Sequence, residues 1–164
     1  MTIHDAQQFR QPQMATAAGR PGLLPSADEL LDAIQDDRSN NHPLAVSASH
    51  AGSLHRRRID EPTRTAEIDT HRSTLMRAID LWVSRNVPTA HTGPTMHTEG
   101  LGPVVDRLAE RLVHAEHATR ALPEHDTRAR RARNRLEEIR LGYDALIAEV
   151  LGGKRQLPRT AAQR

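Results

Sequence analysis

The sequence is poor in cysteine, lysine and aromatic residues. Its 164 residues include no cysteine, one lysine and one residue each of tryptophan, tyrosine and phenylalanine. The absence of cysteine excludes disulfides, thiol nucleophiles and cysteine-based zinc sites. The core must therefore be built from Leu, Ile, Val and Ala, and each large aliphatic side chain contributes about 1.5–3 kcal/mol when it is buried. Such a core is thin, and a homodimer interface would supply further burial.

Long apolar segments are also missing. No apolar run approaches the roughly 20 residues that a membrane-spanning helix needs. The N-terminal residues show no apolar core of a signal peptide. We therefore expect a cytoplasmic protein without a membrane partner, which leaves a second copy of the chain or an unidentified protein as its partner.

Apolar residues recur at helical spacing through the middle of the chain. This pattern predicts one all-α domain over residues 26–152. The expected architecture is a helical bundle of three long antiparallel helices with one or two shorter N-terminal helices. The flanking segments, residues 1–25 and 153–164, lack periodicity and predict disordered tails. Residues 87–99 form a long loop that we expect to be either disordered or functional.

Helix boundaries follow from capping residues. Ser26 and Glu29 have the spacing of a capping box. Gly100 is the preferred N-cap of the fourth helix, since Pro103 then occupies a position whose N–H is free. Asp126 is a suitable N-cap for the last helix. The predicted helices cover about residues 26–35, 43–58, 64–86, 101–122 and 127–151.

Two polar side chains interrupt the predicted apolar faces. His55 projects at the centre of the apolar arc of the second helix, and Arg72 lies among apolar residues of the third. Because an isolated buried charge is very costly, Arg72 should have a carboxylate or a bound anion within reach. A purely structural explanation also exists: His55 donates to a backbone carbonyl, and the guanidinium of Arg72 reaches water. The functional alternative is an interior polar pocket formed by His55, Arg72 and Glu99.

A polar stripe runs along the fourth helix, almost opposite its apolar arc. A solvated outer face is the simplest interpretation, and a metal or ligand site shared with a partner subunit is the alternative. His114 and His117 lack the spacing of a zinc-binding helix, so we predict no metal site. The stripe consists of Asp106, Glu110, His114 and His117.

Arginines are concentrated in the last helix, where five lie between residues 128 and 135. They spread around the helix outside its apolar arc, and no aromatic residues alternate with them to stack on bases. The formal net charge is only +2, from 23 basic and 21 acidic residues. A solvated face is therefore favoured over phosphate contacts, and we do not expect nucleic acid as a partner.

One segment resembles a known family. Residues 97–108 read HTEGLGPVVDRL, which is similar to a motif of the bacterial family catalogued as domain of unknown function 4254. Residues 78–83 and the helix over residues 136–151 are similar to it as well. The resemblance implies a helical fold and a bacterial origin but no activity. It marks His97, Glu99, Asp106 and Arg107 as candidate site residues, with Gly100 where the family motif has Ser or Thr.

The sequence thus favours a non-enzymatic interaction or structural module. No catalytic constellation is recognisable, and no cofactor is predicted. The alternative is a small-ligand-binding protein or an enzyme that uses an interior polar pocket for an anionic or metal-bound substrate. His55, Arg72 and the segment over residues 97–107 motivate that alternative.

Overall fold

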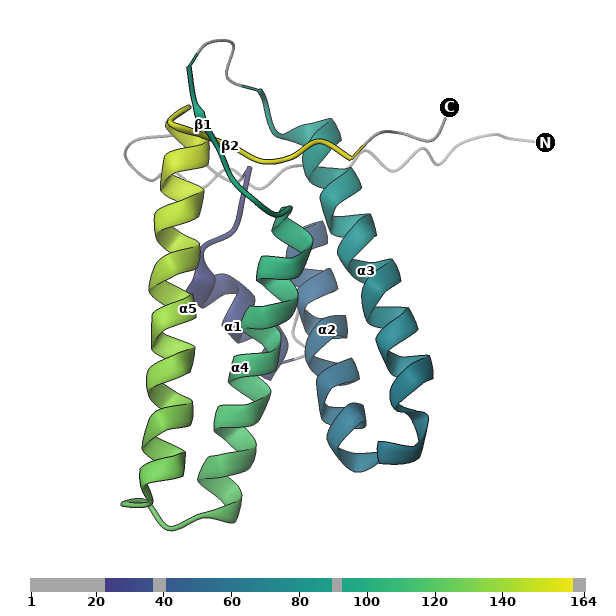
Figure 1. Cartoon of the computed structure of the whole chain (residues 1–164), viewed down its shortest axis with the longest axis vertical. Helices are drawn as coiled ribbons and strands as arrows, with labels where there is room; N and C mark the ends of the chain where they lie inside the picture. Colours follow the sequence, from purple (N-terminus) through teal and green to yellow (C-terminus); the bar gives the residue numbers. More distant parts are fainter. Residues whose placement is uncertain (1–22, 37–40, 90–92, 161–164) are drawn as a thin grey trace, which may run out of the picture.

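The chain folds into a helical bundle, which confirms the predicted all-α class (Figure 1). The computed structural model describes residues 23–36, 41–89 and 93–160. Within these residues no helix is long and apolar enough to cross a membrane. The elements in chain order are α1 (Ala27–Gln35), α2 (Pro43–Asp60), a 3₁₀ turn (Pro62–Arg64), α3 (Thr65–Asn86), β1 (Thr95–Met96), α4 (Leu101–Ala121), α5 (Thr127–Leu151) and β2 (Arg155–Gln156).

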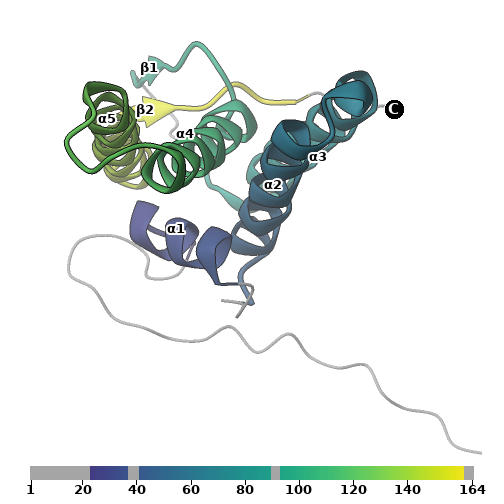
Figure 2. The same ribbon diagram turned by 90° about the horizontal axis from the view of Figure 1, so that it is seen from below.

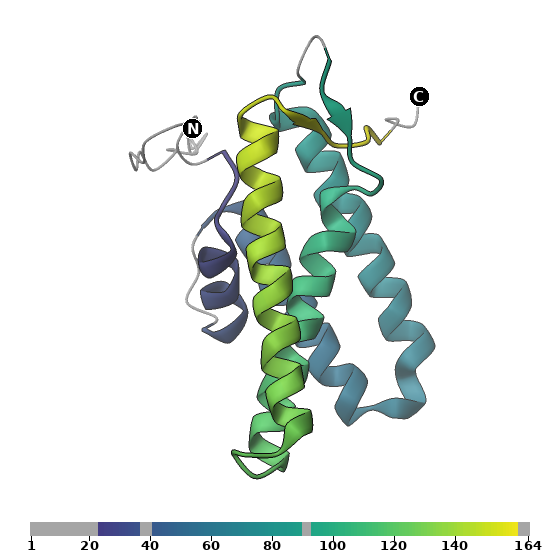
Figure 3. The same cartoon turned by 60° about the vertical axis from the view of Figure 1, so that its left-hand side comes forward.

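Two helical hairpins pack side by side. The 3₁₀ turn joins α2 to α3, and a short connection joins α4 to α5 (Figures 1 and 3). α4 is the central element because it contacts α5, α2, α3 and α1. α1 packs mainly on α2 and also touches α5 (Figure 2). α4 is therefore covered on more than one side, and this decides where the candidate site lies.

The predicted helix starts are confirmed. Ser26 and Glu29 form both hydrogen bonds of a capping box at α1. Gly100 is the N-cap of α4. Asp126 caps α5 by accepting from the backbone N–H of Arg128 at 2.7 Å. The N-cap of α2 is His42, whose ring nitrogen Nδ1 accepts from the backbone N–H of Leu44 at 3.1 Å.

The apolar core centres on α4 and extends to α1 and α5. Tyr143 of α5 is the largest fully buried side chain, and its hydroxyl donates to the carbonyl of Pro25 at 3.0 Å. Asp144 accepts from the first helical N–H of α1, at Ala27, over 2.8 Å. The only tryptophan, Trp82 of α3, meets the ring of His42 edge to face with centroids 5.2 Å apart. These contacts hold α1 and the start of α2 against the rest of the bundle.

α3 and α4 approach each other closely at Gly102. A Cβ atom at this position would collide with the backbone carbonyl of Met76. Backbone cannot move aside as a flexible side chain can, so glycine is required for this helix crossing.

The segment after α5, residues 152–160, contains strand β2. β2 pairs in parallel with β1, and the backbone N–H of His97 donates to the carbonyl of Gln156 at 2.8 Å. Leu157 is buried against the core. Residues 153–160 therefore differ from the predicted disordered tail, because a two-residue strand and a lone leucine leave no periodicity in the sequence. The rest of that tail, residues 161–164, and residues 1–22 of the predicted N-terminal tail lie outside the described residues.

Candidate functional site: a buried ion-pair network

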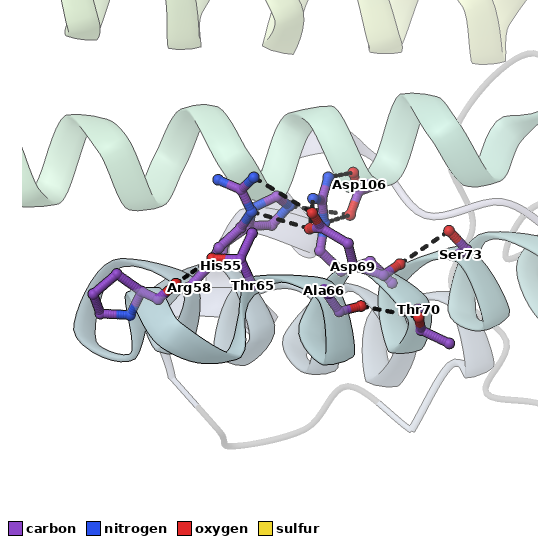
Figure 4. Close-up of polar contacts among 10 residues, drawn as sticks. His55, Arg58, Thr65, Ala66, Asp69, Thr70, Ser73 and Asp106 are labelled. Carbon is purple, nitrogen blue, oxygen red and sulfur yellow. Dashed lines mark hydrogen bonds and ion pairs between the residues drawn. The ribbon is translucent and has the colours of Figure 1, made fainter.

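Three helices meet at one carboxylate. Asp106 of α4 accepts from the guanidinium of Arg72 of α3 through both oxygens, at 3.1 Å to Nε and 2.6 Å to Nη2. Nε2 of His55, on α2, lies 3.0 Å from Oδ1 of the same carboxylate. Figure 4 shows Asp106 facing the side chains that rise from the neighbouring hairpin. His55, Arg72 and Asp106, which join α2, α3 and α4 in this way, form the central trio.

Further ion pairs connect the central trio to the protein surface. Arg72 also donates from Nη1 to Asp69 at 2.7 Å. Asp69 accepts in turn from Nε of Arg58 at 3.0 Å. The side chains of Asp69 and Arg58 are 41% and 45% exposed, against 9% for Asp106. Charge is therefore paired from the buried carboxylate outward along the α2–α3 hairpin.

The hydrogen-bond partners of Asp106 determine whether its carboxyl group is ionised. Burial by itself raises the pKa of a carboxyl group. The hydrogen bonds from His55 and Arg72 outweigh burial and lower the pKa of Asp106 to about 2. Asp106 is therefore ionised at neutral pH, and since an ionised carboxylate only accepts, Nε2 of His55 carries the proton between them. The hydrogen bond with Asp106 likewise raises the pKa of Arg72.

The sequence predictions for these residues had different outcomes. The expected carboxylate beside Arg72 is confirmed. His55 is buried as expected, but its partner is a carboxylate side chain rather than a backbone carbonyl. The interpretation of Asp106 as part of a solvated face is wrong, since only 6% of Asp106 is exposed. α4 is covered by α5 on one side and by α2 and α3 on another, so its polar stripe turns inward at this residue.

The remaining candidates form a second cluster at the start of α4. Nη2 of Arg107 donates to both carboxylate oxygens of Glu99 at 2.9 Å. The ring nitrogen Nδ1 of His97 lies 2.8 Å from the carbonyl of Glu99. The side chains of Arg107 and Glu99 are 41% and 32% exposed, so this pair is solvated. The hydrogen bonds of Glu99 join it to Arg107 and His97, and the predicted pocket of Glu99 with His55 and Arg72 does not form.

Asp80 is a site residue that the sequence reasoning missed. Its Oδ1 accepts from the backbone N–H of Gly102 at 2.7 Å, so α3 supplies the carboxylate that caps α4. Burial raises the pKa of Asp80, and the backbone hydrogen bonds from Gly102 and Leu101 oppose that rise. A Cβ atom at Gly100 would collide with this carboxylate. Gly100 itself has no side chain to cap α4, and the carboxylate of Asp80 takes that role.

The polar groups of the central trio are hydrogen-bonded chiefly to one another. In the part of the chain that the structure describes, no buried side-chain nitrogen or oxygen lacks a partner. Among the same residues, no three His, Asp or Glu side chains converge to hold a metal ion. The two oxygens of Asp106 already accept three hydrogen bonds. The arrangement can fix three helices in one register, with the carboxylate of Asp106 directed at Arg72 and His55.

Fold and site together define a class: a helical bundle in which a buried ion-pair network joins two hairpins. The chain belongs to the family described as protein of unknown function (DUF4254), whose model matches residues 46–158. The resemblance noted in the sequence is thereby confirmed. The matched residues include the central trio, the cluster around Glu99 and strand β2. No curated protein and no solved structure matches the chain.

Proposed function

We propose that the protein is a non-enzymatic interaction module in which the central trio sets the register of the helices. The observation that carries the proposal is that Asp106 of α4 accepts hydrogen bonds from both His55 of α2 and Arg72 of α3. A catalytic or ligand-binding group must keep a donor, an acceptor or a lone pair available to its substrate. In the central trio the carboxylate and the guanidinium are directed at each other, and the trio lies at the junction of three helices.

The thin core supports a homo-oligomer as the working form of the module. Large exposed apolar side chains are few among the described residues, and those present lie on three different elements: Val46, Met96 and Leu141. Such scattered residues do not form a broad apolar patch, so we expect an interface of mixed polar and apolar character, as non-obligate assemblies have.

Native mass spectrometry of two proteins tests the proposal. One is the wild type, and the other replaces the central trio with apolar side chains of similar size (His55→Leu, Arg72→Met, Asp106→Leu). Replacing a whole buried ion network by packed apolar residues is often neutral or stabilising. We expect both proteins to be folded homo-oligomers with the same subunit number, and no non-protein mass that the wild type retains and the triple variant lacks.

Two results would count against the module. A metal or small molecule retained by the wild type and lost from the triple variant would assign ligand binding to the central trio. A strictly monomeric wild type would remove the homo-oligomer. Circular dichroism of the triple variant serves as the control for folding.

Binding of a small anion is the second candidate function. The observation that favours it lies away from the central trio, in a groove between α4 and α5 that arginines line.

A further inference from the structure

The α4–α5 hairpin carries a groove whose walls are almost entirely basic. The groove has a volume of about 260 Å³. Apart from Ala132, every residue that lines it is an arginine or a histidine. The residues from α4 are Arg111 and His114, and those from α5 are Arg128, Arg131, Ala132 and Arg135.

The helical repeat explains why these particular arginines meet. Residues 128, 131, 132 and 135 follow the spacing of neighbours on one face of a helix, as do residues 111 and 114 on α4. The two stripes face each other across the antiparallel hairpin. Arg130 and Arg133 do not line the groove, since they project from the other side of α5. Some of the arginines between residues 128 and 135 thus face arginine and histidine side chains of α4. The spacing of residues along α5 alone does not reveal this.

Most of this positive charge has no internal counter-charge. Residues 111–135 contain seven arginines and three acidic residues, a formal charge of +4. Arg128 is paired with Asp126 at 2.9 Å. Within the described residues, the side chains of Arg111, Arg131 and Arg135 have no hydrogen-bond or ion-pair partner. By contrast, the arginines near the central trio are paired with carboxylates, as Arg58 and Arg72 are.

His114 lines the groove without adding a positive charge to it. Burial lowers the pKa of His114, so its ring is neutral at pH 7 and offers either a donor or an acceptor. The positive charge of the groove therefore comes from three unpaired guanidinium groups on two helices. A compact anion with about three negative charges would neutralise them.

We propose that this groove binds a compact anion that carries two adjacent phosphates. Each phosphate carries roughly −1.5 to −2 charge at pH 7 and three acceptor oxygens, so two of them match three guanidinium groups. Arginine binds phosphate through paired N–H donors in a planar fork. The groove is lined by no Trp, Tyr or Phe side chain on which a base could stack, and its guanidinium groups favour phosphate oxygens, so the phosphates themselves are the recognised group. This inference stands apart from the proposed role of the central trio.

Isothermal titration calorimetry of the full chain with inorganic pyrophosphate at low ionic strength tests the proposal. We expect one saturable site, with much weaker binding of orthophosphate. ADP should bind like pyrophosphate and AMP weakly, and a strong preference for ADP or for pyrophosphate would separate a nucleotide from the free diphosphate as the natural source. Binding of neither pyrophosphate nor ADP would overturn the proposal.

Matched variants separate the groove from diffuse positive charge. Arg131→Gln with Arg135→Gln removes two charges from the groove wall, and Arg130→Gln with Arg133→Gln removes two from the other side of the same helix. The first pair should weaken pyrophosphate binding about tenfold or more. With both variants measured at about 0.15 M ionic strength, where charges are screened beyond roughly 8 Å, the second pair should weaken it less than about twofold. Equal losses in the two variants would overturn the site.

The opposite wall gives an independent check. Arg111→Gln changes one residue of α4 and should weaken binding several-fold, roughly as the loss of one charge-assisted contact does. An unchanged affinity would show that α5 alone attracts the anion and would contradict a two-helix groove. Single-stranded DNA that binds more tightly and is not displaced by pyrophosphate would assign the surface to nucleic acid and overturn the diphosphate site.

Discussion

At the scale of single residues, Asp106 is the side chain through which three helices are hydrogen-bonded to one another. It is the shared acceptor for His55 of α2 and Arg72 of α3. Taking these groups out of water costs free energy, and the attraction between them repays that cost only while every partner is present. Loss of the central acceptor therefore has a larger effect than loss of a peripheral one.

Asp106→Asn should destabilise the fold by about 3–5 kcal/mol, because it leaves the guanidinium of Arg72 partly buried without its main counter-charge. The matched control is Asp69→Asn, which removes a carboxylate from the exposed side of the same guanidinium. That change should cost less than about 1 kcal/mol. Urea denaturation followed by circular dichroism measures both, and equal losses would contradict a buried network centred on Asp106.

The effect of Asp106→Asn should depend on pH. The pKa of Asp106 is about 2 in the folded protein and about 3.9 in an unfolded chain. A carboxyl group with a lowered folded pKa stabilises the fold above its unfolded pKa, and this contribution is lost as pH falls toward the folded pKa. It amounts to something on the order of 2 kcal/mol.

The difference in unfolding free energy between wild type and Asp106→Asn should therefore be largest above pH 4 and shrink as the pH approaches 2. Carboxyl groups that do not share a partner with Asp106 titrate equally in both proteins and cancel in the difference. Asp80 has a raised pKa and acts in the opposite direction, but it is common to both. A difference that stays constant from pH 7 to 3 would count against the ionised state of Asp106.

At the scale of the elements, the junction of α3 and α4 depends on glycine. Gly102→Ala should cost at least about 2 kcal/mol, because the new Cβ would displace the backbone of α3 at Met76. Gly142→Ala is the matched control in α5, where a Cβ meets nothing within 4 Å. There the better helix propensity of alanine should stabilise the protein by roughly 0.5–1 kcal/mol. Thermal unfolding of both variants should show shifts of opposite sign.

The elements also show how far the sequence predicts this protein. Helical spacing of Leu, Ile and Val placed the helices, and capping residues placed several of their starts. His55 and Arg72 stood out because they interrupt apolar faces. Asp106 was marked only by the resemblance to the family, and helical periodicity placed it on a solvated face. The pattern of one helix gives the direction of its side chains but not how many neighbours cover that helix. Asp80 escaped notice for a related reason, because its partner is a backbone group 22 residues away.

At the scale of the whole molecule, the two-residue strands close the α4–α5 hairpin at its open end. β1 precedes α4 and β2 follows α5, so their pairing joins the chain segments that enter and leave the hairpin. Leu157 anchors the second strand in the core. Local pattern cannot reveal this closure, since it depends on contacts about 60 residues apart.

Leu157→Ala should destabilise the protein by about 2 kcal/mol or more, as the truncation of a buried leucine generally does. Leu141→Ala provides the control, because Leu141 of α5 is 56% exposed. A change at that position should stay within about 0.5 kcal/mol. Similar small effects at both positions in guanidinium denaturation would mean that residues 155–157 do not contribute to the folded core.

The edge contact between Trp82 and His42 has a practical consequence for studying the molecule. A chain with one indole emits tryptophan fluorescence from one place, and here that place is the junction between α3 and the N-cap of α2. A shift in its emission therefore reports whether these two helices have separated, without an attached dye. The protein thus contains its own optical probe for the opening of the α2–α3 hairpin.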